Sequence, residues 1–176
     1  MMRNILLAAV LAVLAVNPAF AEDKGQPTNP SYGDWGKTCE KGGKGLDGKE
    51  MGEVCYIFQN ISNKEDGKMV MQVRVGMAPE KKQPVLIVTL PLGVLIPPGA
   101  ALIVEGAAEP MKLPFLACAP EGCTTVGQVI KDDFLEVMKK GEKAAVRVAL
   151  INRKLLTLPV SLKGFTRAYA ALAAGQ

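Results

Sequence analysis

Hydrophobic and polar residues alternate with a period of two along most of the chain, as in β-strands that bury one face. In the segment 70–75 the two faces separate only partly, so we expect one face to be buried more deeply. Turn-forming residues separate the runs, and Asp66-Gly67 is a strong hairpin signal. The predicted strands are 32–39, 54–61, 69–76, 85–90, 100–105, 111–118, 123–126, 144–151 and 155–160.

Two segments have the helical period instead. The first, 128–140, carries Asp132 and Asp133 near its start and two lysines before Gly141, which suits the helix dipole and a C-terminal cap. The second begins near Ser161, which we expect to be its N-cap. We expect both apolar stripes to pack on the core; they comprise Ile130, Phe134, Val137 and Met138 in the first helix and Leu162, Phe165, Tyr169 and Leu172 in the second.

This order of elements predicts a mainly β domain, an antiparallel β-sandwich with one midchain helix and one C-terminal helix. A small β-barrel is the main alternative. The nearly apolar segment 86–104 contains three prolines and two glycines, which argues against a membrane helix. We interpret it as two buried strands joined by a hydrophobic loop at 91–99, and take Leu95 and Ile96 in that loop as a candidate partner surface.

The N-terminus has the organisation of a secretory signal peptide. Arg3 is followed by an unbroken apolar run at 5–16, and small residues occupy positions 19 and 21 before a predicted cleavage site. The run is too short to span a bilayer, which needs about 20 residues. The predicted organisation is a signal peptide at 1–21, a flexible leader at 22–31 and a single β-rich domain at 32–174. We therefore expect a periplasmic or secreted protein whose mature chain begins at Glu22.

Four cysteines in an exported chain indicate disulfides. Three pairings are open, and the spacing favours the two local ones, Cys39 with Cys55 and Cys118 with Cys123. On the chain-entropy model these closures contribute about 3 and about 2 kcal/mol respectively. Redox and zinc sites are the weaker alternatives, because neither pair has the C-x-x-C spacing that those sites usually show.

Composition removes several classes of function. The chain of 176 residues has no histidine, which excludes Ser-His-Asp and Cys-His nucleophiles and histidine-ligated metals. The formal charge of +4, or +3 without the signal peptide, comes from lysines and arginines spread along the chain rather than clustered as for nucleic-acid binding. Ser161 and Lys163 are a weak serine–lysine candidate, outweighed by capping. We predict no catalytic, cofactor-binding or metal-binding residues.

Several motifs together resemble the invasion associated locus B family. They are Tyr32-Gly33-Asp34-Trp35 followed by Cys39 and Cys55; Leu90-Pro91-Leu92-Gly93-Val94 with Pro98-Gly99; Leu113-Pro114-Phe115 with Cys118 and Gly122-Cys123; and Pro159-Val160-Ser161-Leu162-Lys163-Gly164-Phe165. The resemblance covers roughly residues 32–172. It implies a bacterial envelope or secreted protein, whose founding members are linked to host-cell entry, and it brings no catalytic residues. The longer glycine–lysine loop at 40–53 departs from the family pattern.

The sequence thus favours an exported, non-enzymatic envelope protein that acts by binding an envelope or host component. Such a protein would contribute to host-cell interaction or to envelope maintenance. The alternatives are a carboxylate-based hydrolase of envelope polymers, since Asp and Glu perform acid–base chemistry without histidine, and a structural envelope component.

Overall fold

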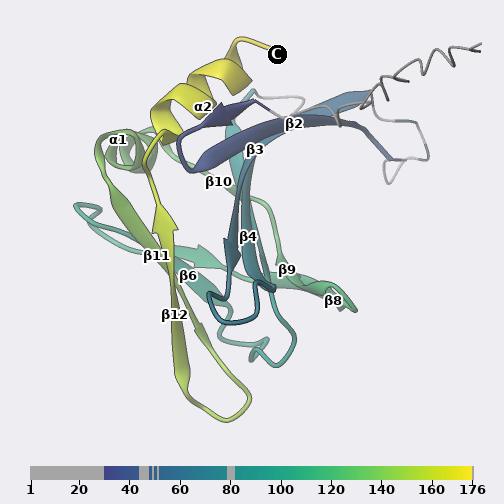
Figure 1. Cartoon of the computed structure of the whole chain (residues 1–176), viewed down its shortest axis with the longest axis vertical. Helices are drawn as coiled ribbons and strands as arrows, with labels where there is room; N and C mark the ends of the chain where they lie inside the picture. The colour runs from purple at the N-terminus through teal and green to yellow at the C-terminus, as the bar shows by residue number, and fades with distance from the viewer. Residues whose placement is uncertain (1–29, 44–47, 49, 51, 79–81, 176) are drawn as a thin grey trace, which may run out of the picture.

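The computed structural model describes residues 30–43, 48, 50, 52–78 and 82–175, which form two antiparallel sheets and two helices (Figure 1). The predicted signal peptide, its cleavage site and most of the leader lie outside the described residues, as does part of the glycine–lysine loop. The described strands form two sheets and no closed barrel, so the sandwich prediction is confirmed over the barrel.

The larger sheet has the strand order β1-β2-β3-β4-β5-β9-β8, and β10 also pairs with β5. The smaller sheet has the order β12-β11-β6-β7. The strands of the larger sheet are β1 (Ser31–Tyr32), β2 (Trp35–Lys41), β3 (Glu53–Ser62), β4 (Met69–Met77), β5 (Pro84–Leu90), β8 (Phe115–Ala119), β9 (Gly122–Thr125) and β10 (Gln128–Val129). Those of the smaller sheet are β6 (Ala100–Val104), β7 (Met111–Leu113), β11 (Lys143–Ala149) and β12 (Leu155–Ser161).

The period of two in the sequence becomes an alternation of burial in the central strands. In β4, Met71, Val73 and Val75 are buried, whereas Gln72 and Arg74 between them are only half-buried. The inward faces of β5, β6 and β11 show the same alternation, and together these side chains fill the space between the two sheets. The core is therefore mostly aliphatic, with valine and leucine the most frequent residues.

Two predicted strands are interrupted. The first breaks at Gly33 and Asp34, which form a turn between β1 and β2. The second breaks at Pro114, which separates β7 in the smaller sheet from β8 in the larger one. Proline has no N–H to give to a ladder, so it suits a point where the chain changes sheets.

Both helices start later than the sequence predicted. Helix α1 runs over Asp132–Lys140, because Gln128 and Val129 pair with β5 instead of forming a first turn. Helix α2 runs over Phe165–Ala173, and its N-cap is Gly164, so the prediction that Ser161 caps it is wrong. Ser161 is the last residue of β12, and its hydroxyl serves the turn that leads into the helix.

Helix α2 covers one end of the sandwich, packing on β1, β2, β3 and α1 (Figure 1). Phe165 and Leu172 of its predicted apolar stripe are buried, and so is Leu162, which lies just before the helix. The ring of Phe165 meets that of Trp35 edge-on at 5.1 Å between centroids. In α1, Met138 is buried, while Phe134 and Val137 are partly buried against the core. No helix in the described part of the chain has the length and apolarity needed to cross a membrane.

Both local disulfides are present. Cys39 and Cys55 are directly opposite each other on β2 and β3, with Cα atoms 4.0 Å apart. Cys118 and Cys123 are opposite on β8 and β9, with Cα atoms 3.9 Å apart. Each bond therefore joins neighbouring strands of the larger sheet.

Candidate functional site

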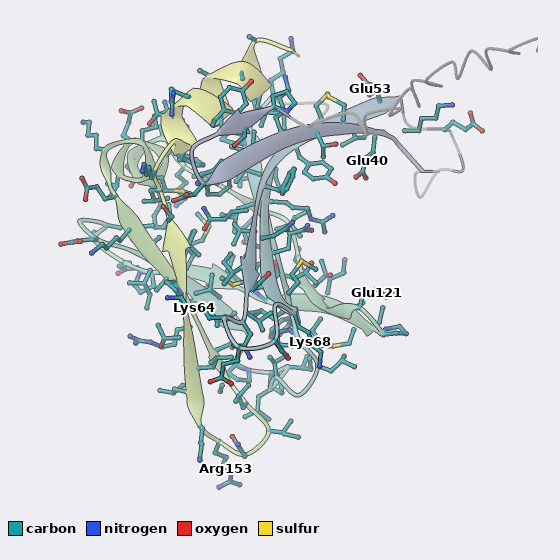
Figure 2. The ribbon with its side chains drawn as sticks, viewed as in Figure 1. Glu40, Glu53, Lys64, Lys68, Glu121 and Arg153 are labelled. Atoms are coloured by element: carbon teal, nitrogen blue, oxygen red, sulfur yellow. A yellow bond between two sulfur atoms is a disulfide. The ribbon has the colours of Figure 1, made fainter. Side chains whose placement is uncertain are left out.

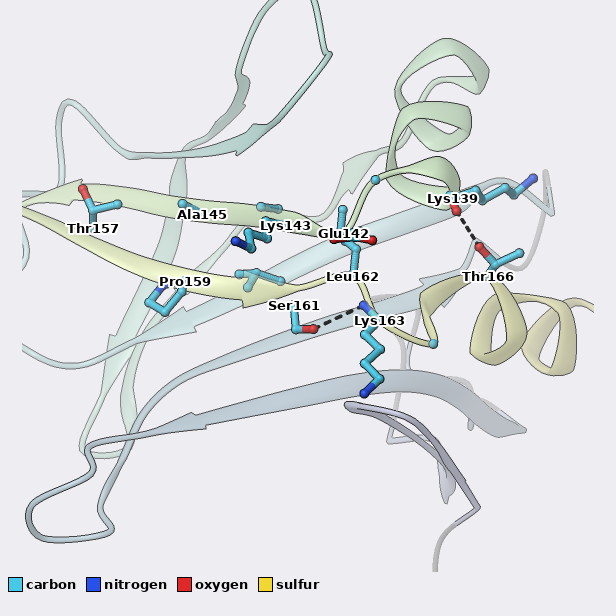
Figure 3. Close-up of a pocket in the computed structure, with 14 residues that line it drawn as sticks. Lys139, Glu142, Lys143, Ala145, Thr157, Pro159, Ser161, Leu162, Lys163 and Thr166 are labelled. Atoms are coloured by element: carbon cyan, nitrogen blue, oxygen red, sulfur yellow. Dashed lines mark hydrogen bonds between the residues drawn. The ribbon is translucent and has the colours of Figure 1, made fainter.

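The fold brings together the motifs from the two ends of the domain, residues 32–35 and 159–165. The backbone N–H of Asp34 donates to the Lys163 carbonyl over 3.1 Å, and the Ser161 hydroxyl donates to the Asp34 carboxylate over 2.5 Å. The same hydroxyl accepts the backbone N–H of Lys163 over 3.2 Å (Figure 3). These contacts hold the β1–β2 turn against the link between β12 and α2.

Glycine is required where these motifs touch. Gly33 and Gly164 have φ angles of +72° and +88°, and both face the backbone of the other motif. A Cβ atom on Gly164 would overlap the Tyr32 carbonyl oxygen, and one on Gly33 would lie 2.8 Å from the Lys163 carbonyl oxygen. Both the backbone conformation and the close approach therefore exclude a side chain.

Gln59 connects the two sheets at the same place. It is a buried polar residue of β3, 6% exposed, and its amide nitrogen donates to the carbonyls of Asp34 and Ser161 over 3.1 and 3.0 Å. Its amide oxygen accepts the Ser161 N–H over 2.9 Å, and the Trp35 indole donates to the Ser161 carbonyl over 2.8 Å. Sequence reasoning missed Gln59. The signal is its spacing: Gln59 lies two residues from both Ile57 and Ile61, so all three side chains point to the inward face of β3.

The serine–lysine candidate does not have the geometry of a nucleophile and its base. The Ser161 hydroxyl is already engaged by Asp34 and by the Lys163 N–H. The Lys163 side chain runs away from that hydroxyl, so its amino group is not placed to take the hydroxyl proton (Figure 3). We therefore assign Ser161 and Asp34 to holding the motifs together.

A cavity of about 870 Å³ lies beside this junction, between α1, the β11–β12 pair and the start of α2. It contains one carboxylate, Glu142, and three lysines whose amino groups point in different directions (Figure 3). Lys139 is 2.9 Å from Glu136, and this hydrogen bond lowers the pKa of Glu136. Since the lysines do not converge, the cavity does not form an anion site.

A second cavity of about 600 Å³ lies between the loop after β6 and helix α1. It is lined by the acids Glu109 and Asp133 together with two lysines. Asp133 accepts the N–H of Phe134 over 2.8 Å and, like Asp132, lies in the first turn of α1. Its carboxylate therefore complements the helix start, as the sequence predicted.

Within the described residues, the atoms that come closest to a metal-ligand cluster are those of Cys39, Glu53 and Cys55. Both sulfurs are joined in the disulfide and are not thiolates, so they do not supply metal ligands in this state.

The loop at 91–99 lies beside the β11–β12 hairpin. The Leu95 N–H donates to the Ala149 carbonyl over 2.8 Å, and the Ile151 N–H donates to the Gly93 carbonyl over 2.9 Å. Ile96 is 45% exposed, whereas Leu95 is half-buried. Of the two residues singled out from the sequence, Ile96 is the more accessible.

Comparison with known proteins identified a matching family model and solved structures of similar fold. The model of the invasion associated locus B (IalB) protein matches residues 35–173. The crystal structure of invasion associated protein B from Bartonella henselae is 21% identical, with a TM-score of 0.69, and the match covers 84% of this chain and 97% of that one. A search of curated proteins with this sequence found no match.

Proposed function

Because the chain belongs to the invasion associated locus B family, we propose that it is an exported, non-enzymatic binding protein of the bacterial envelope. The signal-peptide pattern at 1–21 and two disulfides support export, because disulfides persist in oxidising compartments. Host-cell interaction and envelope maintenance are the two roles that fit this proposal.

The observation that carries a binding role is the apolar loop at 91–99, which leaves Ile96 exposed at the surface. Val94 in the same loop is buried and bridges to Leu150, so the loop is anchored to the core and to the neighbouring hairpin. A preformed apolar loop loses little conformational entropy when it docks. By contrast, the polar side chains at the motif junction are used to join the two sheets.

Export is tested by measuring the N-terminus of the protein recovered from fractionated cells. We expect mass spectrometry to find Glu22 as the first residue, with the protein released from the periplasm or recovered from the medium. An uncleaved chain that stays with the cytoplasmic fraction would contradict export.

The surface is tested by sedimenting the purified domain with washed bacterial envelopes. Ile96→Asp should reduce sedimentation strongly without changing the thermal midpoint. Leu116→Asp is the matched control, because Leu116 is 70% exposed but lies on β8 rather than in this loop. Equal sedimentation of all three proteins would refute the loop as the binding surface. Turnover of an envelope polymer that is lost on replacing Glu109 or Asp133, with folding intact, would instead establish the hydrolase alternative.

A further inference from the structure

Four exposed aliphatic side chains lie at one end of the sandwich, on two chain segments that are hydrogen-bonded to each other. They belong to the loop at 91–99 and to the end of the β11–β12 hairpin, which reaches the lower end of the molecule in Figure 1. We call them the apolar tip: Leu92, Ile96, Ile151 and Leu155, which are 57%, 45%, 70% and 70% exposed.

The two turns are held in place by the backbone. In addition to the two hydrogen bonds between them, the Leu150 N–H donates to the Lys154 carbonyl over 2.9 Å and closes the hairpin. Gly99 ends the loop with a φ of +69°, packed so closely on Leu113 that a Cβ atom would lie 2.8 Å from its carbonyl oxygen. The apolar tip is therefore preformed rather than assembled on binding.

The two segments that build the apolar tip carry charges of one sign. Arg153 and Lys154 are exposed in the hairpin turn, and Arg153 projects from the lower end of the molecule in Figure 2. No acidic residue occurs in the segments 82–104 and 143–163, which build both turns and the strands that carry them. The β3–β4 turn differs, because its Lys68 is paired with Asp66 at 3.4 Å.

This chemistry matches a membrane surface with anionic headgroups. Aliphatic side chains on a protruding turn enter the region between headgroups and acyl chains, and adjacent cations are attracted by acidic lipids. A protein partner is favoured less, because hot spots of protein interfaces are rich in tryptophan, tyrosine and arginine, whereas the four apolar side chains here are aliphatic. The tip residues also line neither of the two cavities described above.

We propose that the apolar tip inserts into the surface of an anionic lipid bilayer, with Arg153 and Lys154 contacting the headgroups. This inference rests on the proposed function, since it names the partner of the surface that contains Ile96. It makes the protein a peripheral membrane-binding domain.

The experiment is co-sedimentation of the purified domain with protein-free vesicles. One set contains equal parts of phosphatidylglycerol and phosphatidylcholine, and the other contains phosphatidylcholine alone. We expect binding to the anionic vesicles that weakens with added salt, and little binding to the neutral ones. Replacing both cations, Arg153→Gln with Lys154→Gln, should weaken the partition about 25-fold, because each cation near an anionic surface contributes about fivefold.

The apolar contribution is tested with Ile151→Asp combined with Leu155→Asp, which should abolish vesicle binding. Leu116→Asp, at the same 70% exposure on β8, should bind as the wild type does. Wild-type domain that does not sediment with anionic vesicles, or tip variants that still do, would overturn the lipid inference. If envelopes bind the domain through Ile96 while vesicles do not, the partner is an envelope component other than the lipid bilayer, and the proposed function stands. If neither envelopes nor vesicles bind the domain, the lipid inference and the proposed function both fail.

Discussion

Replacing Gln59 tests whether the two sheets are joined by its side-chain amide. Gln59→Met keeps the length of the side chain but removes three hydrogen bonds, to the Asp34 carbonyl and to the backbone N–H and carbonyl of Ser161. The Ser161 carbonyl keeps the Trp35 indole as a donor. The Ser161 N–H and the Asp34 carbonyl each lose the Gln59 side chain as a hydrogen-bond partner.

The expected magnitude follows from those two groups. Leaving a buried donor or acceptor unpaired costs about 1–3 kcal/mol, and methionine recovers part of this cost by burying additional apolar surface. We expect a net loss of about 2.5 kcal/mol in the free energy of unfolding. For a domain of this size the midpoint should fall by about 5–10 °C.

The assay is urea unfolding of the oxidised domain, followed by fluorescence of Trp35, which packs beside the site. Gln72→Met is the control, because Gln72 lies on the outward face of β4 and bonds the exposed Asn60 side chain. The control should change the free energy of unfolding by no more than about 0.5 kcal/mol. If Gln59→Met is as stable as this control, the amide does not join the sheets and the reasoning is refuted.

Three further predictions concern the junction, the disulfides and pH. Gly164→Ala should destabilise the domain by about 3 kcal/mol in urea unfolding, because its Cβ atom would overlap the Tyr32 carbonyl. Gly67→Ala is the control and should cost about 1 kcal/mol, because Gly67 has a φ of +68° but no atom near its Cβ position. Equal effects would contradict the close contact with Tyr32. Replacing the Cys118–Cys123 pair by serines should lower the free energy of unfolding by about 2 kcal/mol, and the same replacement of the Cys39–Cys55 pair should lower it by about 3 kcal/mol, because the second disulfide closes the longer loop. The reverse order would count against this dependence on loop length. Burial, and then the Glu40 carboxylate 2.6 Å from its hydroxyl, raise the pKa of Tyr56 above 10.0. Since the folded state holds this proton more tightly, stability should fall as the pH rises through that value, and Tyr56→Phe should remove this part of the loss in alkaline unfolding curves.

The sequence determined those features that depend on neighbouring residues. The period of two placed the central strands, because alternate side chains of a strand necessarily face opposite sides of its sheet. The Asp66-Gly67 turn and the local cysteine spacing placed a hairpin and two cross-strand disulfides, since few residues separate the partners. Phe165 and Leu172 were correctly assigned to the core by their helical spacing, whereas Leu162 is buried but precedes the helix.

Only the tertiary structure decided what depends on partners far away in the sequence. Gln128 and Val129 satisfy a helical pattern, but an open edge of β5 gave their backbone a strand to pair with. Ser161 has the chemistry of an N-cap, yet Asp34, 127 positions earlier, takes its hydroxyl and leaves Gly164 to begin the helix. Leu95 and Ile96 are indistinguishable as aliphatic residues of one loop, and contact with the β11–β12 hairpin leaves Ile96 the more exposed. The physical reason is common to all three: local patterns fix which conformations a segment favours, whereas burial and pairing with remote strands select among them.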